Sequence, residues 1–90
     1  MKRRIHIFIY GKVLGVFFRS FIRDNATALS LKGTVRNLED CVEAVFEGSS
    51  DQINRMIELC RKGPKFAKVS DIRIIEEDFK NEYKEFSIAH

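Results

Sequence analysis

The chain of 90 residues lacks several features that would each point to a special class of protein. It has one proline and no low-complexity tract, which argues against a disordered chain. Its two cysteines, Cys41 and Cys60, stand alone, without a CxxC pair or a metal-like spacing to a histidine. We therefore expect two reduced thiols and no metal site. No hydrophobic run approaches the length of a membrane span, so we expect no membrane partner.

The first residues, MKRRIHIFIYGKV, superficially resemble a secretory signal peptide. The apolar part, residues 5–10, contains His6 and is shorter than the usual hydrophobic region of such a peptide, and no small-residue cleavage site follows it. We interpret this segment as part of the fold and expect a cytoplasmic protein.

The composition is that of an ordinary globular domain, with 44% hydrophobic and 32% charged residues. Its length suits one domain and is too short for two, so we expect a single domain over residues 1–90. The net charge of +3 favours anionic partners, but this excess is too small to predict nucleic-acid binding.

The spacing of apolar residues predicts strands and helices in alternation. Ile5, Ile7 and Ile9 alternate along one face of a first strand. A helical stripe follows at Phe18, Ile22, Ala26 and Leu29. The predicted strands cover residues 4–10, 33–38, 42–48, 67–75 and 86–88, and the predicted helices run from residue 18 to about residue 31 and between residues 49 and 63.

Two turns carry local signals of their own. Ser49 followed by Gln52 has the pattern of a capping box at the start of the second helix. Asp40 and Cys41 stand between two strands, where Asp-Gly would be the usual pair. A positive φ at Cys41 would therefore strain the turn.

The order of the elements, βαββαβ with a short fifth strand at the C-terminus, indicates the fold class. Such an order is typical of an α+β, ferredoxin-like sandwich, in which both helices cover one face of an antiparallel sheet. We expect this architecture here.

The stretch GKVLGVFFR, residues 11–19, interrupts an apolar run with two glycines and ends on Arg19. It leads from a strand into a helix, whose first N–H groups lack partners and whose dipole makes this end positive. Gly11 and Gly15 allow the loop to curl so that its N–H groups surround an anion. Arg19 in the first helical turn could then pair two phosphate oxygens. The same pattern also fits a tight turn with a surface arginine that pairs with Asp24 or Glu39.

Two segments carry a resemblance to a known family. Residues 11–19 are similar to the acylphosphatase signature: a glycine, any residue, valine, usually glutamine, Gly-Val, one variable residue and Phe-Arg. The later run LKGTVRNLED resembles the second signature, Gly-x-Val-x-Asn, with Gly33, Val35 and Asn37 in place. The similarity continues to the terminal EFSI and spans nearly the whole chain.

This resemblance implies a hydrolase that cleaves the carboxyl–phosphate bond of small acyl phosphates without a cofactor. It implies that Arg19 and the loop amides hold the phosphate and that Asn37 holds the attacking water. The loop residues concerned are Leu14, Gly15, Val16, Phe17 and Phe18. We expect inorganic phosphate or sulfate to compete as anions, no nucleic-acid partner, and a monomer.

Four positions depart from the family pattern. Leu14 replaces the usual glutamine, Ser30 a helix-ending glycine, Thr34 a frequent tryptophan, and Cys41 the hairpin glycine. None of them is one of the two side chains with an implied catalytic role. Two other functions stay open: a catalytically weak, phosphate-binding regulatory domain, which Leu14 makes possible, and an RNA-binding ferredoxin-like module.

The implied reaction is chemically consistent with a site that has no catalytic carboxylate or histidine. Its leaving group is a carboxylate, whose conjugate acid has a pKa near ~4, so that the departing oxygen needs no proton at neutral pH. Phosphoryl transfer then depends mainly on positioning and electrostatic stabilisation. A phosphate oxygen of the substrate could serve as the base.

Overall fold

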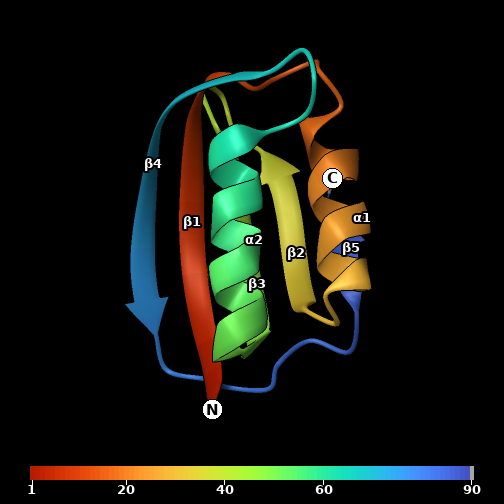
Figure 1. Ribbon diagram of the computed structural model, residues 1–90, viewed down its shortest axis with the longest axis vertical. Coiled ribbons are helices and arrows are strands. Elements are labelled where there is room, and N and C mark those ends of the chain that lie inside the picture. The colour runs from red at the N-terminus through yellow and green to blue at the C-terminus, as the bar shows by residue number, and fades with distance from the viewer. Residues whose placement is uncertain (90) are drawn as a thin grey trace.

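The computed structural model describes residues 1–89, in which two helices pack on one face of a five-stranded sheet (Figure 1). The elements are β1 (Lys2–Lys12), α1 (Phe18–Ala28), β2 (Lys32–Asn37), β3 (Val42–Ser49), α2 (Ser50–Lys62), β4 (Lys68–Glu77) and β5 (Phe86–Ile88). Their order and type agree with the sequence-based prediction, and the architecture is the expected ferredoxin-like sandwich. Among these residues no helix is long and apolar enough to cross a membrane.

The strands lie in the order β4-β1-β3-β2-β5. The neighbours among the first four are antiparallel, as predicted, whereas β5 pairs in parallel with β2, from Gly33 opposite Phe86 to Val35 opposite Ile88. The fifth strand therefore makes the sheet mixed. The reason is the path of the chain after β4, because residues 78–85 cross the end of the sheet and enter β5 beside the start of β2 (Figure 1).

The core lies between the helices and the sheet. Ile5, Ile7 and Ile9 of β1 have no solvent exposure, in agreement with their predicted alternation. Each helix contributes one buried stripe to the same core: Phe18, Ile22 and Ala26 from α1, and Ile53, Met56 and Cys60 from α2. Both cysteines are buried free thiols, and burial raises the pKa of Cys60 to about 12.

Helix α1 ends at Ala28, earlier than the predicted boundary near Leu31. Ser30 has a φ of 58°, and the N–H groups of Ser30 and Leu31 donate to the carbonyls of Thr27 and Ala26. These two bonds form a Schellman motif, in which a left-handed residue closes the helix. Ser30 thus stands where glycine would be unstrained, at a cost of about 1 kcal/mol.

The predicted hairpin is present with one correction, and of the predicted capping box only the Ser49 bond forms, because Gln52 Oε1 is buried without a hydrogen-bond partner within residues 1–89. Ser49 accepts a hydrogen bond from the N–H of Gln52 and caps α2. Between β2 and β3 the N–H of Leu38 donates to the carbonyl of Cys41, whose φ is not positive. The backbone strain that a positive φ would have caused at Cys41 is therefore absent. Gly33 has a φ of 148°, and a Cβ there would collide with the carbonyl of Val45.

The face of the sheet away from the helices carries a network of charged side chains around Glu47. Only 3% of the surface of Glu47 is exposed to solvent. The Glu47 carboxylate accepts hydrogen bonds from the N–H groups of Lys80 (3.0 Å) and Glu82 (2.9 Å). It also pairs with Arg4, which in turn pairs with Glu77 and Glu82. We call these five residues the Glu47 latch, because they fasten the segment between β4 and β5 to the sheet.

The Glu47 latch gives the stability of the fold a predictable dependence on pH. Burial acts to raise the pKa of Glu47, but the N–H donors and Arg4 outweigh it, so the pKa lies below its usual value. The hydrogen bond with Arg4 also lowers the pKa of Glu77. A carboxyl with a lowered folded-state pKa contributes stability that is complete above its unfolded pKa of about 4.3 and is lost as the pH falls through the folded value.

We therefore expect the free energy of unfolding to fall as the pH drops below about 4.3. Urea unfolding followed by circular dichroism between about pH 7 and about pH 3 measures this dependence. Glu47→Gln has no titratable group at this position, so its free energy of unfolding should fall less steeply at acid pH than that of the unchanged protein. A midpoint that stays constant across the acid range in the unchanged protein would contradict this assignment.

Candidate active site

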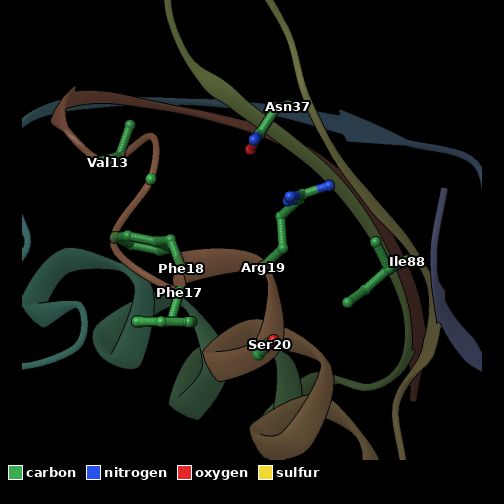
Figure 2. A pocket seen from close by; sticks show the side chains of 8 residues that line it. Val13, Phe17, Phe18, Arg19, Ser20, Asn37 and Ile88 are labelled. Carbon is green, nitrogen blue, oxygen red and sulfur yellow. The ribbon is translucent and has the colours of Figure 1, made fainter. Parts of the chain in front are cut away.

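A pocket opens at the N-terminal end of α1. Its volume of about 240 Å³ is smaller than that of sites for drug-sized ligands. Four elements form it: the β1–α1 loop, the first turn of α1, the end of β2, and β5 (Figure 2). The residues that line it are Val13, Gly15, Phe17, Phe18, Arg19, Ser20, Asn37 and Ile88.

Two residues of the loop before α1 have a left-handed backbone conformation. Gly15 has a φ of 73° and Phe17 a φ of 61°. A Cβ built at Gly15 meets nothing within 4 Å, so glycine is favoured there by its backbone conformation and not by lack of space. Phe17 is the residue preceding α1, and holding a bulky side chain in this conformation costs about 1 kcal/mol. Such local strain is common at functional sites.

The same loop leaves a run of backbone N–H groups without protein partners. Within residues 1–89, no oxygen accepts a hydrogen bond from the N–H groups of residues 14–20. The first N–H group of α1 that does have an acceptor is that of Phe21, which donates to the carbonyl of Phe17. The N–H groups in the first turn of a helix point back along its axis, toward the positive end of the helix dipole. These donors can bind an anion at the pocket.

Arg19 lies in the first turn of α1 and is half-buried. In the described part of the chain, its guanidinium forms no ion pair or hydrogen bond. Asp24, one of the two surface partners considered from the sequence, pairs instead with Arg23 at 3.1 Å. Within residues 1–89, Arg19 forms no ion pair with Asp24 or Glu39, so the alternative of a surface ion pair is wrong.

Asn37 reaches the pocket because of the alternation along β2. Gly33 and Val35 are buried beneath the helices, and Asn37 faces the same way two residues further on. There the strand has passed the N-terminal end of α1, so the amide side chain is exposed. Figure 2 shows the side chains of Asn37 and Arg19 pointing into the same space, from β2 and from α1.

The pocket brings together most of the residues expected from the sequence. Arg19, Asn37, the loop residues Gly15 and Phe17, and Phe18 at the start of α1 line it. Leu14 and Val16 belong to the loop without lining the pocket. Val13, Ser20 and Ile88 also line it and were missed. The alternating Phe86 and Ile88 indicated a strand, but not that β5 would pair with β2 and place Ile88 beside Asn37.

The charge at the pocket has one sign. Arg19 is the only charged residue among those that line it, and residues 1–89 contain no group of three histidine, cysteine or acidic side chains placed to hold a metal ion. His6, which the sequence left as a sheet residue, pairs with Glu43 at 2.7 Å on the far face of the sheet. A pocket with one positive charge suits an anion better than a cation.

Comparisons with known proteins show what this chain is similar to. The family model for acylphosphatase matches residues 5–88. A curated acylphosphatase of Syntrophobacter fumaroxidans is 48% identical over 89 residues, which cover 98% of this chain and 92% of that protein.

Two solved structures are also similar. That of an acylphosphatase from Coxiella burnetii has a TM-score of 0.93 at 37% identity and covers 98% of this chain and 93% of its own. The acylphosphatase from Bacillus subtilis has a TM-score of 0.94 at 32% identity, with all of both chains covered. The match to the family model, the identity to a curated relative and the shared fold lead to one conclusion: this chain belongs to the acylphosphatase family.

Proposed function

We propose that the amides from Leu14 to Phe18 and the guanidinium of Arg19 bind the phosphate of an acyl phosphate, and that Asn37 positions the attacking water. The reaction is that of an acylphosphatase, the hydrolysis of a carboxyl–phosphate bond to a carboxylate and phosphate. The observation that carries these roles comes from residues 1–89: a run of N–H donors without acceptors lies in a loop that lines the same pocket as Arg19, and Arg19 has no ion pair among these residues.

The two kinds of donor complement each other for a dianion. Backbone N–H groups at a helix N-terminus are fixed by the fold, so they need no reorganisation when charge moves over the phosphoryl oxygens. Arg19 adds a full positive charge and a planar fork of donors that matches two oxygens. Because Arg19 is half-buried, water screens this charge less than it would on the open surface.

Asn37 supports the placement of a water on one side of the bound phosphate. Its amide offers both a donor and an acceptor, and no side chain or backbone group within residues 1–89 hydrogen-bonds with it. Its position across the pocket from the loop suits attack on phosphorus along the line of the breaking bond (Figure 2).

Proton transfer in this scheme involves the substrate. None of the pocket-lining residues in the described chain is a carboxylate or a histidine, so no side chain there is a strong candidate base. A phosphate oxygen can take the proton of the water as the new P–O bond forms. The carboxylate leaves without a proton because its pKa is far below neutral pH. Both requirements of the reaction are thus met by binding and positioning.

We propose a monomer as the active unit, because the loop, Arg19 and Asn37 of a single chain suffice to form the pocket. Product phosphate carries the same head group as the substrate, so we propose that inorganic phosphate competes for the pocket. An acetyl phosphate assay with inorganic phosphate as competitor tests both the activity and the binding site. Protein that binds phosphate but releases none from acetyl phosphate would contradict the catalytic role of the pocket.

Asn37→Ala should lower kcat for acetyl phosphate by about 10²-fold or more, because the water loses its fixed position. The inhibition constant for inorganic phosphate should change less than about threefold, since the anion donors remain. Asn54→Ala is the matched control, because this asparagine lies on α2 and contacts Arg3, away from the pocket. An Asn37 variant with weaker phosphate binding and unchanged kcat would reassign the residue to substrate binding.

A further inference from the structure

We propose that Ile88 of β5 is a positioning residue for Arg19: its side chain packs beside the arginine and holds the guanidinium at the pocket. This inference rests on the proposed function, because it assumes that Arg19 binds the phosphate. It assigns a part in the reaction to the short strand β5, whose contribution to the pocket lining is this one apolar side chain.

The position of the Arg19 side chain is not fixed by a polar contact in the described part of the chain. The residue is half-buried, and its guanidinium forms no ion pair or hydrogen bond within residues 1–89. An arginine has several rotatable bonds, so its side chain is among those with the most conformational freedom to lose. A donor that stabilises a transition state must stand in place before charge moves. The conformation of Arg19 therefore depends on the apolar groups packed around its stem.

Of the apolar residues that line the pocket in residues 1–89, Ile88 is the one placed beside Arg19. Val13 and Phe18 are 1% and 2% exposed and belong to the core. Figure 2 shows the ring of Phe17 directed away from the space that the guanidinium points into. Ile88, by contrast, extends from β5 toward the arginine in Figure 2, and α1 packs against β5.

The fold holds Ile88 firmly enough to act as a wall. Strand β5 pairs in parallel with β2, where Val35 stands opposite Ile88, and the N–H of Ala89 donates to the carbonyl of Val35 at 2.8 Å. Two residues before Ile88, Phe86 is buried and stacks on Phe46. Ile88 itself is half-buried and lines the pocket. A stiff, β-branched side chain on an anchored strand limits the conformations of the arginine beside it.

The same contact strengthens the charge of Arg19 as the phosphate experiences it. An apolar side chain next to the guanidinium keeps water from that side, and a charge attracts an anion more strongly where less water screens it. Truncation of Ile88 lets water in and lets the guanidinium move. Both effects act through Arg19, so they should disappear in a protein that lacks this arginine.

The experiment is a double-mutant cycle on Ile88 and Arg19, measured as kcat/KM for acetyl phosphate. It compares the wild type, Ile88→Ala, Arg19→Ala and the double variant, and circular dichroism verifies that each is folded. Ile88→Leu keeps an apolar side chain of the same size. Ile75→Ala is the matched control, because Ile75 lies opposite His6 on the face of the sheet away from the helices and is 51% exposed.

We expect Ile88→Ala to lower kcat/KM by about tenfold in the wild-type background and by less than about twofold in the Arg19→Ala background. Ile88→Leu should stay within about threefold of the wild type, and Ile75→Ala within about twofold. The inhibition constant for inorganic phosphate should rise in Ile88→Ala, because Arg19 binds the anion. If Ile88→Ala does not fold, Ile88→Val takes its place in the cycle, with an expected loss of about threefold.

Equal losses in the two backgrounds would overturn the positioning role, because the effect of Ile88 would then not pass through Arg19. An unchanged kcat/KM in a folded Ile88→Ala would overturn it as well. In both cases the activity of the wild type and its dependence on Arg19 would remain, and the proposed function would stand. A wild-type protein that does not hydrolyse acetyl phosphate would instead overturn the proposed function.

Discussion

Arg19→Ala should lower kcat/KM for acetyl phosphate by about 10³-fold or more, the size of effect seen when a charged or preorganised donor is removed from a phosphoryl-transfer site. Within residues 1–89, Arg19 is the only charged residue that lines the pocket, and it is bound to no acidic side chain. Its removal therefore deletes the full positive charge at the site and leaves only backbone dipoles. Steady-state release of phosphate from acetyl phosphate measures the loss.

Two further variants separate the charge from its geometry and from its position. Arg19→Lys keeps a positive charge but not the planar fork, so we expect it to stay about 10²-fold below the wild type. Arg23→Ala is the control: Arg23 lies one turn later on α1, is exposed, and pairs with Asp24. It should change kcat/KM by less than about twofold. If Arg19→Ala kept substantial turnover, Arg19 would have no part in the mechanism.

Glu47→Ala should destabilise the fold by about 3 kcal/mol, a large share of the ~5–15 kcal/mol that holds a typical domain together. The substitution removes the acceptor for the N–H groups of Lys80 and Glu82 and one partner of Arg4. Donors that lose a charged acceptor in a buried setting cost about 1–3 kcal/mol each, and Arg4 keeps Glu77 and Glu82 as partners. Urea unfolding at neutral pH measures the difference.

The control for this prediction is an ion pair at the surface. Glu76 pairs with Arg3 at 2.9 Å, but its side chain is 55% exposed. Glu76→Ala should therefore change the free energy of unfolding by less than about 1 kcal/mol. Hydrogen exchange gives a second readout, because the amides of Lys80 and Glu82 should lose protection in Glu47→Ala before the core strands do. Equal stability losses for the two variants would show that burial of Glu47 contributes nothing special.

The Glu47 latch has a consequence for the site as well as for the fold. It holds the segment between β4 and β5, and β5 then pairs with β2 and packs Phe86 against Phe46, with ring centroids 5.3 Å apart. Ile88, at the end of this strand, completes the pocket wall beside Asn37. A charge network on one face of the sheet thus supports the wall of the candidate active-site pocket at the end of the sheet.

The parts of the structure that follow local rules are those that the sequence predicts well. The alternation of Ile5, Ile7 and Ile9, the stripe of α1 and the Ser49 cap each depend on neighbours within one or two turns of chain. The main misjudged boundary, the end of α1, is also local in origin. Ser30 takes a left-handed conformation that a serine side chain does not signal.

The site divides in the same way. The glycine loop and the first turn of a helix are adjacent in sequence, so the spacing of Gly15 and Arg19 by itself predicts a positive end with free N–H donors. Asn37 lies in the same pocket because α1 packs against β2. The family resemblance predicted this placement, but the alternation along β2 alone does not require it. The contribution of Ile88 depends on the parallel pairing of β5, for which no short-range signal exists.

The order of the elements, the helix stripes, the Ser49 cap and a glycine loop that leads into α1 can be predicted from the sequence, because periodicity, capping and backbone freedom act over a few residues. The burial of Glu47 by residues 78–85, on the face away from the helices, follows from packing across the whole fold, as does the meeting of Arg19, Asn37 and Ile88. These contacts join residues far apart along the chain. They form only when the free energy of packing the whole sheet and both helices selects one register and one path for the chain.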